Sequence, residues 1–401
     1  MARLPGVDVP EQVVCHVDMD CFYAACERLR DPRLDGEPVV VGMGYEAGET
    51  HGAVATASYE AREHGVESAM SITEALERLP RRIEDGTDSD DPTGVYRSVD
   101  MDFYEAVSED VRSVLSRAAE TVRNVSIDEA YLDLGDLEWS DAAAFGRSLK
   151  RDIEAEAGVV ASVGIAPDMT TAKLASDADK PDGLLVVEPA DVRSFLAPIP
   201  VGDLHGVGPV TASELREMGF ETAGDIAAAE ASVFADAFGK RGRALHAQAR
   251  GEDDRTVEPK GDPKSISSES AFAEATADSG RKRGQIETLA RDVAERAAAE
   301  NALYRTIGIK VVEPPFDVHT RSQSLSGPVD DPELVERTAI ELLTEFETER
   351  VRKLGVRLSN LSFDAREQAT IARWDTDEGE TDLDRRWNRT AGGQARLSKF
   401  E

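Results

Sequence analysis

Ser126-Ile127-Asp128-Glu129-Ala130-Tyr131 is the stretch around which the chain is organised. It places two carboxylates between two β-prone runs, residues 122–127 and 131–134. A second acidic stretch, Val17-Asp18-Met19-Asp20, follows the apolar run 13–17 near the start of the chain. Carboxylates that converge from neighbouring strands repel each other unless a cation lies between them. The sequence therefore predicts a cation site where two strands meet.

The ligand types indicate a hard divalent cation. Oxygen ligands without Cys or His favour Mg²⁺, with Mn²⁺ as the alternative, and two such ions about 3.5–4 Å apart are the usual apparatus of phosphoryl transfer. We expect Asp18, Asp128 and Glu129 to bind them. Because adjacent strand residues point to opposite faces, Asp128 and Glu129 can share the site only across a turn or bulge. Alternatively, acidic residues simply end strands here, which is our interpretation of Asp20 and Asp133.

Composition limits the class of protein. The chain has 401 residues and is 40% apolar, enough for two to four domains with their own cores. No apolar run approaches the length of a membrane span and the start lacks the apolar core of a signal peptide, so we expect a cytoplasmic protein. Cys15, Cys21 and Cys26 match no zinc spacing and are expected to be buried thiols.

The charge is strongly acidic. Lys and Arg number 46 against 79 Asp and Glu, a net charge of −33. DNA binding depends on neutralising phosphates, so either the chain does not bind nucleic acid or it works in very high salt. At 1 M salt, screening reaches only about 3 Å. Acid spread along the whole chain, few Lys beside Arg, and 5% aromatics favour the second interpretation, the protein of an extreme halophile.

Five pieces of the chain, in this order, resemble the Y-family DNA polymerases, specifically their DinB (polymerase IV) branch. The pieces are Asp18-Met19-Asp20-Cys21-Phe22-Tyr23-Ala24, Ala53-Val54-Ala55-Thr56-Ala57-Ser58-Tyr59-Glu60-Ala61-Arg62, Ser126-Ile127-Asp128-Glu129-Ala130-Tyr131, Ala178-Asp179-Lys180-Pro181-Asp182-Gly183 and Gly206-Val207-Gly208. The resemblance spans residues 12–363. Any one piece is weak, but five in order are highly specific.

The resemblance implies an α+β multidomain fold. The implied domains are a palm (1–21 and 99–187), small fingers (22–98), a helical thumb with a helix-hairpin-helix (188–252), a linker (253–263), a C-terminal little finger (264–363) and a disordered acidic tail (364–401). Sequence patterns predict an antiparallel palm sheet with two helices on one face; its predicted elements are strands 12–18, 122–134 and 159–164 and helices 99–119 and 140–157. The order β-α-β-β-α-β, with a helix over 332–349, is expected for the little finger.

Tyr23 gains a role from the resemblance. It lies one helical turn beyond Asp18, where it would stack under the sugar of an incoming nucleotide as the steric gate that excludes a 2′-hydroxyl. Phe22, beside it, would also contact the nucleotide. Without the family context, a tyrosine on a core-facing helix start is the simpler interpretation.

Four further residues would bind the triphosphate. Tyr59 and Arg62 are three apart and share one helix face, so a phenol and a guanidinium could grip phosphate oxygens. Thr56 could add a hydroxyl contact, and Lys180, before Pro181, is the expected triphosphate lysine. The alternatives are a surface Tyr59 and Arg62 stacking on each other and a solvated Lys180.

One segment departs from the family pattern. Ala166, Pro167, Asp168 and Met169 stand where the family usually shows a Ser, a basic residue and Asn-Lys. The departure removes positive charge near the expected path of primer or triphosphate. It leaves the role of Lys173, which is retained, open.

Two groups of residues are expected at DNA. Gly206 and Gly208 would let backbone N–H groups at a helix start hold a phosphate without any lysine, although a plain turn between packed helices fits the same glycines. The little finger would add phosphate contacts from Lys264, Arg305, Arg321 and Arg357.

The chain ends on a motif resembling those that bind the ring-shaped sliding clamp. Gln394, Leu397 and Phe400 lie at three-residue spacing, so one turn could fill an apolar pocket. Glu401 stands where the full motif has a second aromatic residue.

The function implied is template-directed DNA synthesis by a low-fidelity translesion polymerase. Asp18, Asp128 and Glu129, with the Met19 carbonyl, would hold two Mg²⁺ ions while deoxynucleoside triphosphates are added to a primer 3′-hydroxyl on primer–template DNA. We expect a monomer with no membrane contact. The alternatives are a non-catalytic scaffold that binds DNA and the clamp, and a nucleotide cyclase, which also uses a palm sheet and two metals but needs no hairpin motif.

Overall fold

The chain forms two units, residues 1–261 and 262–401. The computed structural model describes residues 12–82 and 92–363. Outside them lies the predicted clamp-binding end, Gln394, Leu397 and Phe400. Within the described ranges, no helix is both long and apolar enough to cross a membrane.

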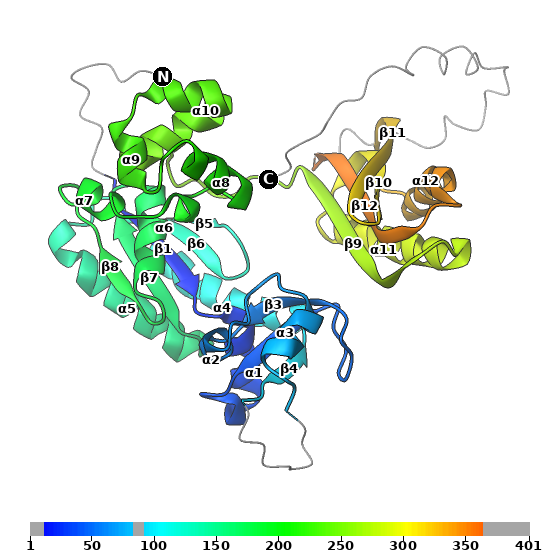
Figure 1. The fold of residues 1–401 in the computed structure, drawn as a ribbon, viewed down its shortest axis with the longest axis horizontal. Coiled ribbons are helices and arrows are strands. Elements are labelled where there is room, and N and C mark those ends of the chain that lie inside the picture. The colour runs from blue at the N-terminus through cyan, green and yellow to red at the C-terminus, as the bar shows by residue number, and fades with distance from the viewer. Residues whose placement is uncertain (1–11, 83–91, 364–401) are drawn as a thin grey trace. The chain divides into compact units, whose positions relative to one another are not determined.

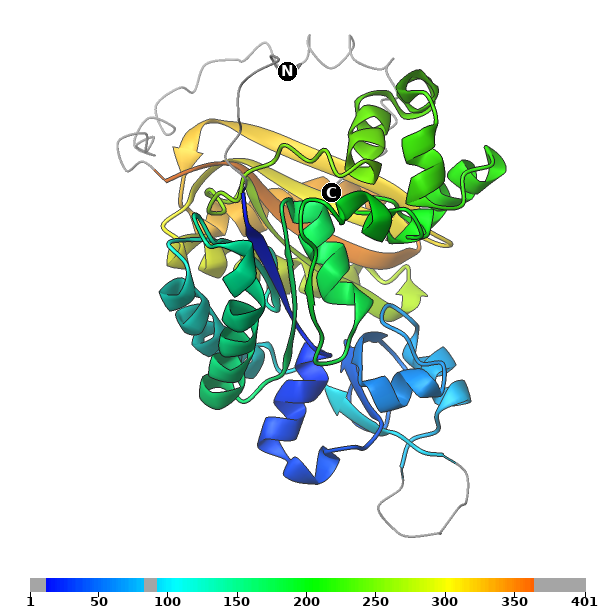
Figure 2. The same ribbon diagram turned by 90° about the vertical axis from the view of Figure 1, so that its left-hand side faces the viewer.

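A five-stranded sheet with β1 at its centre organises the first unit (Figures 1 and 2). Across the sheet the strands are β5 (Thr121–Asn124), β6 (Glu129–Asp133), β1 (Val14–Met19), β7 (Ala161–Ala166) and β8 (Leu184–Val186). The predicted antiparallel pairing holds for the first four, but the strand expected over 122–134 forms two strands, β5 and β6, because the chain turns between them. The sequence pattern does not predict β8, which runs parallel to β7 because a helix crosses over between them. The sheet is therefore mixed.

Helices cover both faces of this sheet. They are α4 (Met101–Ala118) and α5 (Trp139–Ala157) on one face, as predicted, and α6 (Met169–Ala178) on the other. Side chains alternate along β1, so that Cys15 and Val17 join the core under α4 and α5 whereas His16 reaches Ser176 on α6. Asp18, two residues beyond His16, shares the α6 face.

Between β1 and α4 the chain builds a smaller body on a three-stranded sheet. Its strands, in order, are β3 (Ala53–Ala57), β2 (Val39–Met43) and β4 (Val95–Ser98), and its helices are α1 (Phe22–Arg30), α2 (Tyr59–Glu63) and α3 (Ile72–Arg78). The sequence pattern misses β4, which pairs parallel to β2. Ser58 and Ser71 cap α2 and α3 by accepting hydrogen bonds from backbone N–H groups in the first turn.

Helices that follow β8 share a core with α6. They are α7 (Val192–Leu196), α8 (Pro209–Glu217), α9 (Ala223–Ala228) and α10 (Ala231–Ala249). Gly206, with φ of +78°, turns the chain toward α8 in a conformation that glycine adopts without strain. Gly208 is the N-cap of α8. The predicted helix-hairpin-helix segment thus takes a turn-then-helix form.

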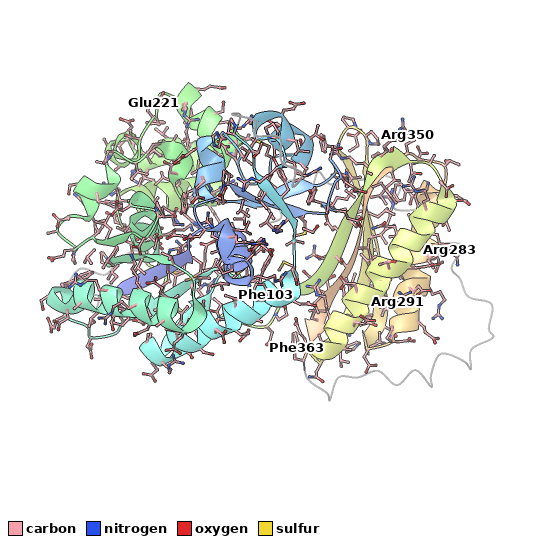
Figure 3. The ribbon with its side chains drawn as sticks, turned by 90° about the horizontal axis from the view of Figure 1, so that it is seen from below. Phe103, Glu221, Arg283, Arg291, Arg350 and Phe363 are labelled. Atoms are coloured by element: carbon pink, nitrogen blue, oxygen red, sulfur yellow. The ribbon has the colours of Figure 1, made fainter. Side chains whose placement is uncertain are left out.

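The second unit has the predicted order β-α-β-β-α-β. Its elements are β9 (Ser265–Thr276), α11 (Ser279–Ala299), β10 (Leu303–Glu313), β11 (Asp317–Val329), α12 (Pro332–Leu343) and β12 (Val351–Ser362), with sheet order β11-β10-β12-β9. One apolar core lies between the sheet and both helices, while Arg283 and Arg291 stand on the exposed side of α11 (Figure 3). The helix expected over 332–349 ends at Leu343 and is followed by a 3₁₀ turn over Thr344–Phe346, where buried Lys282 binds the carbonyls of Phe346 and Glu347.

Candidate active site

Asp18 and Glu129 lie directly opposite each other in the antiparallel pairing of β1 with β6. Opposite residues in such a pair place their side chains on the same face of the sheet. Both carboxylates therefore lie on the face that α6 covers, where each reaches a lysine. The structure thus brings together two of the three carboxylates expected at the site.

A lysine contacts each of these carboxylates. Lys180 Nζ is 2.6 Å from Asp18 Oδ1, and Lys173 Nζ is 2.6 Å from Glu129 Oε2. Burial raises the pKa of Asp18 to about 6, although Lys180 opposes the shift. The neighbouring His16 and Lys173 lower the pKa of Glu129 to about 2 against the effect of burial. Lys173, whose role the sequence leaves open, is therefore part of this cluster.

His16 is a site residue that sequence reasoning misses. It is fully buried, with Nδ1 2.7 Å from Ser176 Oγ and Nε2 3.3 Å from Glu129 Oε2. Burial lowers the pKa of the imidazole and so favours its neutral form. Among the described residues, Nε2 has no aligned hydrogen-bond partner. His16 therefore lies beside the Glu129 carboxylate on the side of the core.

Asp128 lies in the turn that the sequence requires before β6. Ser126 Oγ donates to Asp128 Oδ1 at 2.6 Å and accepts from the Glu129 N–H at 3.1 Å, while the Met19 N–H donates to the Asp128 carbonyl at 3.0 Å. The Asp128 side chain is thus engaged by Ser126. No three His, Cys, Asp or Glu side chains of residues 12–82 and 92–363 are gathered as a ready-made metal cluster.

Asp20 has a larger role than the strand end that the sequence suggests. It is 5% exposed and accepts hydrogen bonds from Ser162 Oγ at 2.9 and 3.1 Å, from the Tyr59 hydroxyl at 3.0 Å and from the Asp182 N–H at 2.7 Å. These donors come from β7, from α2 and from the loop after Lys180. Asp20 therefore joins the central sheet to both predicted nucleotide-binding segments. The Asp133 side chain, in contrast, accepts from the Gly135 N–H at the end of its strand, as expected.

Tyr23 lies in the first turn of α1, partly buried, with its ring stacked on Tyr104. Burial and, after it, the charge of Asp128 raise the pKa of its phenol. Phe22 is 1% exposed and belongs to the core, so that only its backbone remains for a nucleotide. Thr56 lies on β3, partly buried.

Tyr59 and Arg62 stack on each other, which is the alternative the sequence left open. The Arg62 Cζ atom is 4.8 Å from the centroid of the Tyr59 ring, and Arg62 Nε donates to the Ala57 carbonyl at 3.0 Å. The stack orients the guanidinium without an acidic partner among the described residues.

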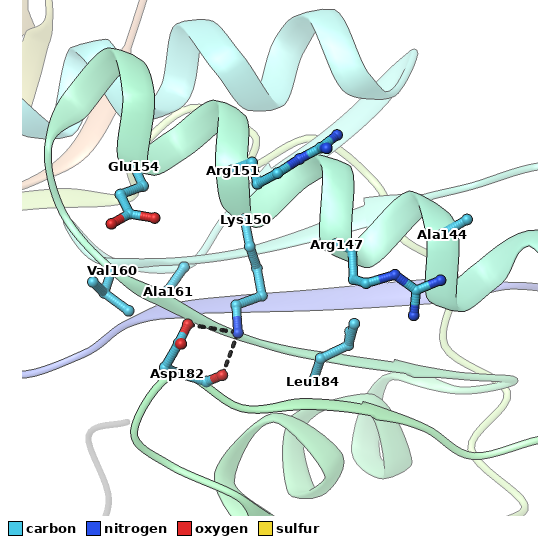
Figure 4. A pocket seen from close by; sticks show the side chains of 9 residues that line it. All are labelled: Ala144, Arg147, Lys150, Arg151, Glu154, Val160, Ala161, Asp182 and Leu184. Atoms are coloured by element: carbon cyan, nitrogen blue, oxygen red, sulfur yellow. Dashed lines mark hydrogen bonds and ion pairs between the residues drawn. The ribbon is translucent and has the colours of Figure 1, made fainter.

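A pocket lies between α5 and the loop that carries Asp182 (Figure 4). Lys150 Nζ is 2.7 Å from Asp182 Oδ1 and also donates to the Gly183 carbonyl at 3.1 Å. The residues that line the pocket are Ala144, Arg147, Lys150, Arg151, Glu154, Val160, Ala161, Asp182 and Leu184. None of the predicted catalytic residues lines it. The pocket contributes to the site through Lys150, which binds the loop at Asp182 and Gly183.

The segment that follows α10 packs against the rest of the first unit, although the sequence predicts a linker from residue 253. Asp253 Oδ2 accepts from Thr170 Oγ1 at 2.8 Å and from Arg255 Nη2 at 2.6 Å, and Val257 is 4% exposed. Asp168, in the segment that departs from the family pattern, caps α6 by accepting a hydrogen bond of 2.8 Å from the Thr171 N–H in the first turn. The altered segment and the start of the predicted linker thus form one joint at the N-terminus of α6.

The residues expected at DNA are placed on both units. Carbon atoms built at Gly206 and Gly208 would meet nothing within 4 Å, and Arg241 donates to the Gly206 carbonyl. In the second unit, exposed residues include Lys264 and Arg305. Two further arginines there have partners, Arg321 with Glu345 at 2.7 Å and Arg357 with Ser265 at 3.0 Å.

The geometry fits the class of template-dependent polymerases. Its features are the strand-end carboxylates beside lysines, the smaller body that bears Tyr59 and Arg62, the turn before α8 and the α+β second unit. Family models agree. Residues 17–177 match the impB/mucB/samB family, residues 263–371 match its C-terminal domain, and residues 189–220 match the IMS family HHH motif.

Curated relatives carry the name DNA polymerase IV. One from Halobacterium salinarum is 60% identical over 94% of this chain and 92% of its own length, and one from Methanoculleus marisnigri is 42% identical over 90% and 97%. A solved Y-family DNA polymerase chimera of Dbh and Dpo4 has a TM-score of 0.77 at 27% identity, covering 88% of this chain and all of that one. The chain therefore belongs to the Y-family DNA polymerases and is a DinB-like translesion DNA polymerase. Neither the scaffold nor the cyclase alternative is favoured.

Proposed function

We propose that Asp18 and Glu129, with Asp128 and the Met19 carbonyl, bind two Mg²⁺ ions for nucleotidyl transfer. The observation that carries the proposal is the cross-strand pair of Asp18 and Glu129, each with an ammonium group 2.6 Å away. The donors are hard oxygens, and the ammonium group beside each carboxylate supports the proposal that a cation fits there. Bound there, Mg²⁺ would lower the pKa of a primer 3′-hydroxyl and neutralise the leaving pyrophosphate.

Around those carboxylates, the chain's own cations take the charge of the triphosphate. Lys180 is held at the site by Asp18, and the loop that carries it is fixed by the hydrogen bond from Asp182 to Asp20. Arg62, stacked on Tyr59, presents its terminal nitrogens from α2, and Thr56 adds a hydroxyl. Guanidinium and ammonium groups are the usual phosphate ligands, so these residues would orient the nucleotide for in-line attack.

Selectivity for deoxynucleotides falls to Tyr23 in this proposal. Its ring lies in the first turn of α1, five residues beyond Asp18, where the sugar of a bound nucleotide would rest. A ring fixed there excludes a 2′-hydroxyl by contact. The backbone at Phe22 precedes it and would support the same sugar.

DNA would be held without a strongly basic surface. Backbone N–H groups at the start of α8, next to Gly206 and Gly208, suit a phosphate, since the helix N-terminus itself supplies partial positive charge. Lys264 and the arginines Arg305, Arg321 and Arg357 of the second unit would add contacts, and the tail ending in Gln394, Leu397 and Phe400 would dock a sliding clamp. The palm, fingers, thumb, linker and little finger are proposed with the boundaries predicted from the sequence.

The proposal is tested by Asp18→Asn and Glu129→Gln. Both should abolish Mg²⁺-dependent primer extension and weaken Mn²⁺ binding, measured by titration followed by electron paramagnetic resonance. Asp133→Asn is the matched control, because it removes a carboxylate from the other end of β6 and should leave both measurements unchanged. Full extension by either site variant would rule out this metal site.

A further inference from the structure

The ring of Tyr23 rests on a second tyrosine. Tyr104 comes from α4, and its ring centroid lies 4.6 Å from that of Tyr23 with 19° between the planes. Tyr104 is fully buried whereas Tyr23 is partly exposed. In this stack the Tyr104 ring is fixed in the core and the Tyr23 ring lies at the edge of the core. The position of the Tyr104 ring therefore sets the plane of the Tyr23 ring.

The hydroxyl of Tyr104 is bound back to α1. It donates a hydrogen bond of 2.8 Å to Glu27 Oε1, and Glu27 lies four residues beyond Tyr23, on the same side of that helix. α1 thus contacts Tyr104 twice, once through the Tyr23 ring and once through the Glu27 carboxylate. A ring held at both its face and its hydroxyl cannot slide or tilt without breaking one of these contacts.

Glu27 is buried, although none of the roles proposed for the site requires a carboxylate there. Its residue is 3% exposed, and a carboxylate removed from water is costly unless it is well paired. The neighbouring Arg30 and Arg97 have nitrogens 3.9 Å from it, and each is closer to another carboxylate. Among the described residues, the Tyr104 hydroxyl, at 2.8 Å, is thus closer to the Glu27 carboxylate than either arginine.

We propose that Glu27 and Tyr104 are positioning residues that set the height and tilt of the Tyr23 ring and thereby the discrimination against ribonucleotides. The inference rests on the proposed role of Tyr23. A 2′-hydroxyl is excluded by van der Waals contact, which changes steeply over fractions of an ångström. A loosened Tyr104 would let Tyr23 retreat by such a distance, so that ribonucleotides gain entry while deoxynucleotides, which do not touch that edge, are little affected.

The test is the ratio of kcat/KM for a deoxynucleotide over the matching ribonucleotide in single-nucleotide primer extension. Tyr104→Phe keeps the stacked ring and removes the hydroxyl, and it should lower the ratio on the order of tenfold, the size of change expected for one hydrogen bond. Glu27→Ala should do the same from the other partner, which keeps the test decisive if Tyr104→Phe folds poorly. Glu27→Gln retains a carbonyl oxygen that can accept from Tyr104 and should largely keep the ratio.

Tyr96→Phe is the matched control. Tyr96 is also buried and donates a hydrogen bond of 2.7 Å to the Leu79 carbonyl, but it lies in the core of the smaller body, away from Tyr23. Its loss should reduce stability without changing the ratio. If Tyr104→Phe and Glu27→Ala slow both substrates equally, their role is only structural and the inference is wrong.

Tyr23→Ala separates failure of the inference from failure of the proposed function. If it lowers the ratio while Tyr104→Phe and Glu27→Ala do not, Tyr23 is the gate but is positioned by other contacts. If Tyr23→Ala leaves the ratio unchanged, the role proposed for Tyr23 is itself wrong, and the inference fails with it.

Discussion

Each buried carboxylate of the site has hydrogen-bond or ion-pair partners from distant parts of the chain. Lys180 and Lys173 lie against Asp18 and Glu129, and Asp20 is surrounded by hydroxyl and backbone donors. A carboxylate removed from water costs several kcal/mol unless such partners are present. The partners therefore do two things at once, since they stabilise the fold and fix the direction in which each carboxylate points.

Asp20→Asn tests this reasoning at the residue where the most segments meet. The amide keeps one acceptor oxygen but turns an NH₂ group toward donors, so at least one buried hydrogen bond is lost. We expect a loss of about 1–3 kcal/mol in the free energy of unfolding, measured by chemical denaturation. Because Asp20 also holds the Lys180 loop, KM for the deoxynucleotide should rise. Asp133→Asn should change neither value, and an unchanged KM in Asp20→Asn would contradict the link to the loop.

The sequence indicates Asp18, Glu129 and Lys180 because strand ends and a local motif mark them. It cannot indicate Asp20 in the same way, since its partners lie 39, 142 and 162 residues away and are brought together only by the fold. His16 is hidden for a related reason. A single His in an apolar strand reads as core, and only the pairing of β1 with β6 shows that it lies beside Glu129.

The elements around the N-terminus of α6 form the joint from which the chain leaves the first unit. Thr170 and Arg255 bind Asp253, and their hydrogen bonds lower its pKa although burial alone would raise it. The stability this carboxylate contributes is thus present above the ordinary Asp value of 3.8 and is lost as the pH falls through the lower folded value. At neutral pH the segment 253–257 should therefore be held firmly.

Asp253→Asn tests the joint. The variant loses the charge that pairs with Arg255, so amide hydrogen exchange of residues 253–257 at neutral pH should become faster, as followed by mass spectrometry. Glu252→Gln is the control, because the exposed Glu252 side chain accepts a hydrogen bond of 2.9 Å from Arg250, close to it in the sequence. Unchanged exchange in Asp253→Asn would mean that packing of Val257 alone holds the segment.

Helices and strands are predicted correctly where the local pattern of apolar residues marks them. Short strands that form only by pairing with a distant strand are missed. The helices α4 and α5 and the order of elements in the second unit follow from apolar spacing. β8 has three residues and β4 four, too few for alternation to show, and each is a strand only because a longer neighbour pairs with it in parallel. The carbonyls beyond α12 are bound by Lys282, which is distant in sequence.

For the whole molecule, the net charge of −33 sets the conditions under which it can hold DNA. Phosphates would be repelled at low ionic strength, whereas at 1 M salt the screening length falls to about 3 Å and only close contacts count. Contacts through backbone N–H groups at a helix start suit that regime. The relative from Halobacterium salinarum fits the interpretation that the acidic composition is that of a protein from a halophile.

Primer extension across a KCl series is the most direct test of the account. The wild-type chain and Glu129→Gln would be compared on the same primer–template with Mg²⁺ and deoxynucleotides, from low salt to molar KCl. We expect extension that strengthens toward molar KCl and is absent in Glu129→Gln at every salt concentration. Extension by Glu129→Gln equal to that of the wild type would contradict the proposed metal site, and extension that is strongest at low salt would contradict the account of the charge.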